Sequence, residues 1–196
     1  CLVGSEMCIR DSFNAFLSAC KKIHDAKKEI CVDSASNKII NQDILTVTSS
    51  DFNKSVGLAI TSPPYPNAYE YWLYHKYRMW WLGFDPIQVR TFEIGARPHY
   101  QKKNGQTEED FKTQMNRVFS LLSDVLISGG HVCFVVGRSV IKWKVINNAE
   151  LICNIASEHG MVCVANIERE IASTKKSFNL KYGKIKTENI LVFRKD

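Results

Sequence analysis

Residues 57–65 read GLAITSPPY, a pattern that indicates the fold class. The apolar residues 57–60 predict a short buried strand, and the two prolines end it, because proline lacks an N–H group and fixes φ. A polar loop at the end of a buried strand is typical of an open α/β sheet, in which ligands bind at the carboxyl ends of the strands. The sequence therefore predicts a stiff binding loop at residues 61–65.

The loop carries groups suited to chemistry on an exocyclic amino group of a nucleobase. The lone pair of such an amine is delocalised into the ring, so the amine must rehybridise to attack a methyl group and must shed a proton in the reaction. The Ser62 hydroxyl and the Pro63 carbonyl are candidate acceptors, and Pro64 holds them in place. Tyr65 offers an aromatic face for a base that has been extruded from a duplex.

A second interpretation of the same residues is a ligand for an SH3-type groove, because Pro63-x-x-Pro66 fits a polyproline II segment. The apolar strand before the prolines and the long aromatic stretch after them favour the catalytic interpretation.

Ser62-Pro63-Pro64-Tyr65 resembles the catalytic motif Asp/Asn/Ser-Pro-Pro-Tyr/Phe of the amino-group DNA methyltransferases, which modify cytosine N4 or adenine N6. A serine preceded by Thr61 is more similar to the cytosine-N4 branch. Residues 66–84 and 93–97 also resemble this family, so the resemblance runs from about residue 38 to residue 194.

The resemblance implies catalytic roles for Ser62, Pro63, Pro64 and Tyr65, with S-adenosylmethionine as the cofactor and DNA as the substrate. It implies direct transfer of the methyl group from sulfur to nitrogen, without a metal, and a restriction endonuclease as a functional partner. The alternatives are an adenine-N6 DNA or RNA base-amine methyltransferase, or a noncatalytic nucleic-acid-binding fragment. The class expected is α/β, a Rossmann-like class I methyltransferase with three α/β/α layers, of which the catalytic half of the sheet is present.

The remaining pattern of the chain predicts alternating helices and strands. Helices are expected at residues 13–28, 68–82, 107–126 and 148–159, and further strands at residues 38–45, 131–136, 161–171 and 188–194. In the second helix, Tyr69, Leu73, Tyr77 and Trp80 form a stripe expected to pack inward. Residues 85–106 are expected to form a long basic loop that faces the substrate.

The cofactor site is the weakest part of the resemblance. The family's Phe-x-Gly-x-Gly loop is absent from all 196 residues, and Gly129-Gly130 precedes a strand instead of following one. Asp43 is the one candidate for contact with the cofactor adenine, with an ordinary solvated turn as the alternative. Residues 1–12, CLVGSEMCIRDS, resemble a translated sequencing adaptor, so the catalytic domain is expected to cover residues 13–196, to continue upstream and to be inactive alone.

The charge of the chain agrees with a polyanionic partner. The net charge is +6, and candidate DNA contacts are Asn67, Arg97, Lys175, Lys176 and Lys181, although a solvated basic surface explains the charged residues equally well. The seven cysteines include no C-x-x-C pair, which predicts reduced thiols and no zinc site. No apolar run is long enough for a membrane span and no signal peptide is evident, so a cytoplasmic protein is expected.

Overall fold

The computed structural model describes residues 3–29, 38–53, 55–67, 69–170 and 187–196, in two separate units, Cys1–Ile40 and Asn41–Asp196. The first unit contains helix α1 (Val3–Glu29), which confirms the helix expected at residues 13–28. The side chains of its apolar stripe are exposed, with Phe16 at 64% and Ile23 at 71%. Nothing described within this unit covers that stripe.

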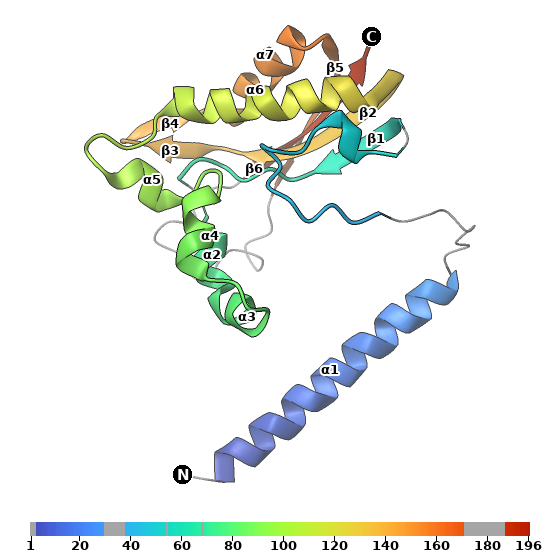
Figure 1. Cartoon of the computed structure of the whole chain (residues 1–196), viewed down its shortest axis with the longest axis vertical. Coiled ribbons are helices and arrows are strands. Elements are labelled where there is room, and N and C mark those ends of the chain that lie inside the picture. The colour runs from blue at the N-terminus through green and yellow to red at the C-terminus, as the bar shows by residue number, and fades with distance from the viewer. Residues whose placement is uncertain (1–2, 30–37, 54, 68, 171–186) are drawn as a thin grey trace. The chain divides into compact units, whose positions relative to one another are not determined.

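The second unit is built on a four-stranded sheet with the strand order β1-β2-β6-β5 (Figure 1). Strands β1 (Val56–Thr61) and β2 (Leu126–Gly137) are parallel, whereas β6 (Thr187–Lys195) is antiparallel to both β2 and β5 (Met161–Glu170). The α/β class and the final antiparallel pair predicted from the sequence are confirmed.

Helices α6 (Glu108–Val125) and α7 (Asn148–Glu158) lie together on one face of this sheet (Figure 1). The core between them and the sheet is apolar and aromatic, and Phe119 stacks on Phe134 with a centroid distance of 5.1 Å. Its fully buried members include Phe111, Met115, Phe119, Val132, Phe134, Ile152, Ile155, Leu191 and Phe193. This layer fixes the position of β2, on which the loop after β1 depends.

A capping box begins α6, which confirms the helix expected at residues 107–126. The Asp110 carboxylate accepts hydrogen bonds from the Thr107 N–H at 2.7 Å and from the Thr107 hydroxyl at 2.9 Å. The backbone bond, followed by the hydroxyl bond, lowers the pKa of Asp110. The helix ends at Val125, and Leu126 already belongs to β2.

The short helices lie on the side of the sheet opposite α6 (Figure 1). Instead of one helix over residues 68–82, the chain forms α2 (Tyr71–Tyr74) and α3 (Lys76–Trp81). The expected inward stripe is wrong for three of its members, because Leu73, Tyr77 and Trp80 are 39%, 66% and 56% exposed. Breaking the helix at His75 removes the continuous face that the helical period assumed.

Two further expectations are wrong. Residues 38–45 do not form a strand, because the Asp43 side chain accepts a hydrogen bond from the Leu45 N–H at 3.0 Å and closes a turn. Residues 85–106 are not one loop, because they contain α4 (Pro86–Phe92) and α5 (Arg97–Gln101). Helix α4 begins where the Asp85 carboxylate accepts a hydrogen bond from the Ile87 N–H at 2.9 Å.

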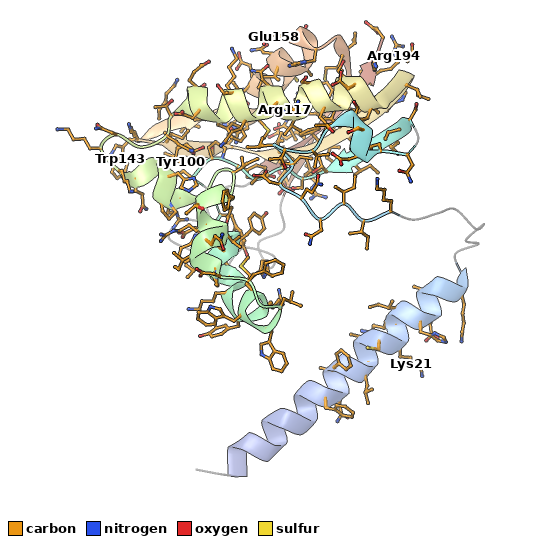
Figure 2. All side chains as sticks on the ribbon, in the orientation of Figure 1. Lys21, Tyr100, Arg117, Trp143, Glu158 and Arg194 are labelled. Atoms are coloured by element: carbon orange, nitrogen blue, oxygen red, sulfur yellow. The ribbon has the colours of Figure 1, made fainter. Side chains whose placement is uncertain are left out.

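A two-stranded hairpin follows β2. Strand β3 (Ser139–Ile141) pairs with β4 (Lys144–Ile146), and the buried Ile141 and Ile146 pack with Tyr100 of α5. Figure 2 shows Tyr100 beside the hairpin.

Candidate active site

The candidate catalytic loop begins where the parallel pair of strands ends. Thr61, the last residue of β1, lies opposite Phe134 of β2, and Ser62 follows it directly. Pro63 and Pro66 are buried, whereas Ser62 is exposed. Buried prolines therefore anchor the loop while its polar residue faces outward.

Two hydroxyl groups of the loop converge on one carbonyl of the neighbouring strand. The Tyr65 hydroxyl donates to the Val135 carbonyl oxygen at 3.2 Å, and the Ser62 hydroxyl donates to the same oxygen at 3.4 Å. Because the Ser62 proton points to Val135, the lone pairs of Ser62 Oγ are left to accept hydrogen bonds from another group. No sequence pattern indicated this role for Val135, since it depends on strand pairing across 73 positions.

Tyr65 is half-buried and its ring packs against the main core. Burial raises the pKa of Tyr65 above 10.0, although hydrogen bonds with Ser62 and the Gly137 backbone lower it. The side chain is therefore a neutral phenol at physiological pH, with its ring held by a bond at its hydroxyl end.

A distant segment holds the loop from the other side. The Asn67 N–H donates to the Gly95 carbonyl oxygen at 2.9 Å. Gly95 has φ +77°, and a Cβ atom there would lie 2.6 Å from the Tyr65 carbonyl oxygen. The position requires glycine both for its left-handed backbone and for this close approach.

Glu93, in the same segment, caps α2. Its two carboxylate oxygens accept hydrogen bonds from the Tyr71 and Trp72 N–H groups, each at 2.8 Å. Arg97 lies 3.6 Å from the Glu70 carboxylate, with side chains 29% and 15% exposed. The resemblance included residues 93–97, but the sequence did not indicate that they clamp the loop.

Asn67, a predicted DNA contact, is built into the loop. Its φ is +58°, and its side-chain Nδ2 donates to the Val140 carbonyl oxygen of the hairpin at 2.5 Å. Its Oδ1 is buried without a hydrogen-bond partner among the described residues. Asn67 thus joins the catalytic loop to the hairpin β3–β4.

The remaining predicted DNA contacts are three lysines, and α3 carries two further basic side chains. Lys175, Lys176 and Lys181 fall outside the described residues. The guanidinium of Arg78 lies 2.8 Å from His75 Nδ1, and the Lys76 ammonium lies 5.0 Å from the centroid of the Tyr77 ring.

The described residues do not fit a complete S-adenosylmethionine site. Asp43 lies in an exposed turn that Arg117 of α6 holds through the Leu45 and Val47 carbonyls at 3.3 and 3.2 Å (Figure 2). Gly130 allows close packing of the backbone, because a Cβ atom there would lie 2.8 Å from the Ile127 carbonyl oxygen and 3.3 Å from the Gly57 carbonyl oxygen. Within the described ranges no glycine loop follows a strand, and no cluster of three metal-ligating side chains occurs.

No protein-family model and no curated protein matches the chain. Among solved structures, a candidate DNA modification methylase of Thermus thermophilus is 21% identical, with a TM-score of 0.46 over 78% of this chain and 50% of that one. The same protein complexed with S-adenosyl-L-methionine gives 21% identity and a TM-score of 0.47 over 78% and 53% of the two chains. A candidate methyltransferase of Thermoplasma acidophilum gives 11% identity and a TM-score of 0.31 over 73% and 70%.

The chain thus spans about half the length of the Thermus protein that it matches. These similarities are distant. None of the described helices combines the length and the apolar character needed to cross a membrane.

Proposed function

We propose that residues 62–65 bind and activate the target amine in an S-adenosylmethionine-dependent DNA methyltransferase, with cytosine N4 preferred over adenine N6. One observation carries this proposal. The Ser62 and Tyr65 hydroxyls both donate to the Val135 carbonyl, so the Ser62 oxygen presents its lone pairs outward at the carboxyl end of a parallel strand. A base amine needs such a fixed acceptor as it becomes positively charged.

Each loop residue has a distinct role in this proposal. Ser62 Oγ and the Pro63 carbonyl accept hydrogen bonds from the amine, which orients its lone pair and disperses the charge that develops on nitrogen. Pro63 and Pro64 keep these acceptors from relaxing. Tyr65 stacks on the extruded base, and its bond to Val135 fixes the plane of its ring.

The methyl donor is S-adenosylmethionine, whose sulfonium supplies an electrophilic methyl group. Asp43 is the only residue of the described part with a proposed contact, to the cofactor adenine. Its Oδ1 already accepts a hydrogen bond from Leu45, but its exposed carboxylate retains a second oxygen as an acceptor. We expect the 196-residue chain alone to bind the cofactor weakly.

The proposed partners and location follow from the resemblance of residues 62–65 to the amino-group DNA methyltransferases. DNA is the proposed partner, a restriction endonuclease is a proposed functional partner, and the cytoplasm is the proposed location. Arg97 forms an ion pair with Glu70 in the structure. To contact a DNA phosphate, the Arg97 guanidinium must either leave Glu70 or bind the carboxylate and the phosphate together. Adenine-N6 or RNA base-amine methylation is the second candidate, since those motifs share Pro-Pro-Tyr/Phe.

Single-turnover kinetics on DNA with saturating substrate test the roles in the loop, using the gene expressed from its own start codon. Ser62→Ala should lower the methyl-transfer rate about tenfold to a hundredfold, with little change in base binding. Tyr65→Ala should weaken target-base binding by about 1–3 kcal/mol, whereas Tyr65→Phe should retain most of it. An unchanged rate for Ser62→Ala would remove Ser62 from the mechanism, and equal losses of cofactor and base binding in Tyr65→Ala would indicate a structural tyrosine.

The basic segment supplies a second test. Replacing Lys175, Lys176 and Lys181 by glutamine should weaken duplex binding and reduce the slope of log affinity against log salt by about one unit for each lost phosphate contact. An unchanged slope would show that these lysines are only solvated.

A further inference from the structure

The turn of the hairpin β3–β4 is unusual in both of its central residues. Lys142 has φ +46° and Trp143 has φ +70°, and neither is glycine or asparagine, the residues that such two-residue turns favour. A bulky aromatic residue in the left-handed region is rare, and strained backbone of this kind clusters at functional sites. The sequence around the turn, residues 142–144, reads KWK.

Trp143 is 97% exposed, although tryptophan is the largest apolar side chain. Figure 2 shows it at the outer end of the hairpin. The hairpin is held at both of its ends, because Ile141 next to the turn and Ile146 at the base are buried with Tyr100. The buried Asn148 side chain also donates to the Gly137 carbonyl at 2.7 Å. The hairpin β3–β4 is therefore a rigid arm that presents the exposed ring of Trp143.

The arm is joined to the candidate catalytic loop. The Asn67 side chain donates to the Val140 carbonyl of β3, and β3 follows β2, whose Val135 carbonyl holds Ser62 and Tyr65. The hairpin β3–β4 and the candidate catalytic loop are thus connected through Asn67 and through strand β2. Lys144 is paired with Glu108 at 2.8 Å, whereas Lys142 has no carboxylate within salt-bridge distance among the described residues.

We propose that Trp143 and Lys142 form a DNA contact beside the base held by residues 62–65, an inference that rests on the proposed function. Extruding a base breaks its stacking with the neighbouring base pairs, and an inserted apolar or aromatic side chain can take its place. The indole stacks on an exposed base step, and the Lys142 ammonium lies on an adjacent phosphate. The strained turn is retained because it projects both side chains from a rigid support.

The test uses fluorescence-detected binding of the full chain to a mixed-sequence DNA duplex with one mismatched cytosine, which lowers the cost of extrusion. Trp143→Ala should weaken binding about tenfold, and Trp143→Phe should weaken it less because a ring remains. Trp81→Phe is the matched control, since Trp81 is 90% exposed on α3 and its replacement should leave the affinity unchanged. Lys142→Gln should reduce the slope of log affinity against log salt by about one unit.

A double variant separates a DNA contact from a structural role. Replacing Lys142 by Asn and Trp143 by Gly gives the turn its preferred residues, so the thermal midpoint should stay equal or rise while duplex binding falls at least about tenfold. A merely structural turn would show improved stability with unchanged binding, which would overturn the inference.

The remaining outcomes are also decisive. Wild-type binding with no effect of any Trp143 variant would overturn this inference and leave the proposed function standing. Failure of the wild-type chain to bind the duplex, or binding only to a matched RNA duplex, would overturn both. A change of oligomeric state in Trp143→Ala with unchanged DNA affinity would show that the ring contacts protein and would refute the DNA contact.

Discussion

Replacing Gly95 by alanine is the sharpest perturbation of the loop that the structure offers. Gly95 has φ +77°, and its new Cβ would lie 2.6 Å from the Tyr65 carbonyl oxygen and 3.0 Å from the Tyr65 carbonyl carbon. Both neighbours are backbone atoms, so they cannot rotate aside as a side chain would. The loop must shift or Gly95 must move.

Gly83 is the matched control, because it has φ +80° and a Cβ atom added there would meet no other atom within 4 Å. Alanine costs about 1–2 kcal/mol at either site for the left-handed backbone alone. The close contact at Gly95 adds about 1–3 kcal/mol, which is typical of overpacking. We therefore expect Gly95→Ala to lose about 2–5 kcal/mol of unfolding free energy and Gly83→Ala about 1–2 kcal/mol.

Urea unfolding of the two variants, followed by circular dichroism, measures this difference. If the loop yields locally instead, the global unfolding free energy will fall less, and base binding will be lost in Gly95→Ala only. Equal stability losses with equal base binding in the two variants would refute the clamp between Gly95 and Tyr65.

Three other substitutions test hydrogen bonds of Tyr65 and Glu93 and the buried hydroxyl of Tyr100. Tyr65→Phe removes the bond to Val135 and should cost about 0.5–1.5 kcal/mol in thermal or urea unfolding; no change would show that this bond is absent. Glu93→Gln leaves one acceptor oxygen for two N–H groups and should lower stability by about 1–3 kcal/mol, with full stability in the variant contradicting the cap. Burial, followed by Asp110, raises the pKa of Tyr100 to about 12, because both disfavour the ionised side chain; stability is therefore retained below about pH 10 and falls as the pH rises from about 10 to 12. Tyr100→Phe should abolish about 2–3 kcal/mol of this loss of stability at alkaline pH. At about pH 7 the variant should be as stable as the wild type or more stable, because the buried Tyr100 hydroxyl has no partner among the described residues. An unchanged dependence of unfolding free energy on alkaline pH would contradict this.

The sequence predicted the elements that short-range signals determine. The apolar run before Ser62 became β1, and the box formed by Thr107 and Asp110 began α6 at the expected residue. Helix α4 also had such a signal, because Asp85 and Pro86 are typical of an N-cap and a first helical position, but the scarcity of apolar periodicity in that region concealed it.

The interactions of the site depend on pairings that no local pattern encodes. The meeting of Ser62 and Tyr65 at Val135 requires the register of β1 against β2, and the Gly95 contact requires a distant segment to fold back onto the loop. Residues 38–45 failed as a strand for a similar reason, because the Asp43 turn and the bonds from Arg117 outweigh strand propensity. The candidate residue types of the loop could thus be predicted, whereas their hydrogen-bond partners could not.

Nucleoside mass analysis tests most directly whether this loop activates a base amine in DNA. The gene should be expressed from its own start codon in a host without DNA methylation, beside the Ser62→Ala variant. We expect N4-methylcytosine in the DNA of the first culture and a strong reduction in the second. N6-methyladenine would correct the base preference, whereas unmodified DNA, or methylation found only in RNA, would contradict the claim.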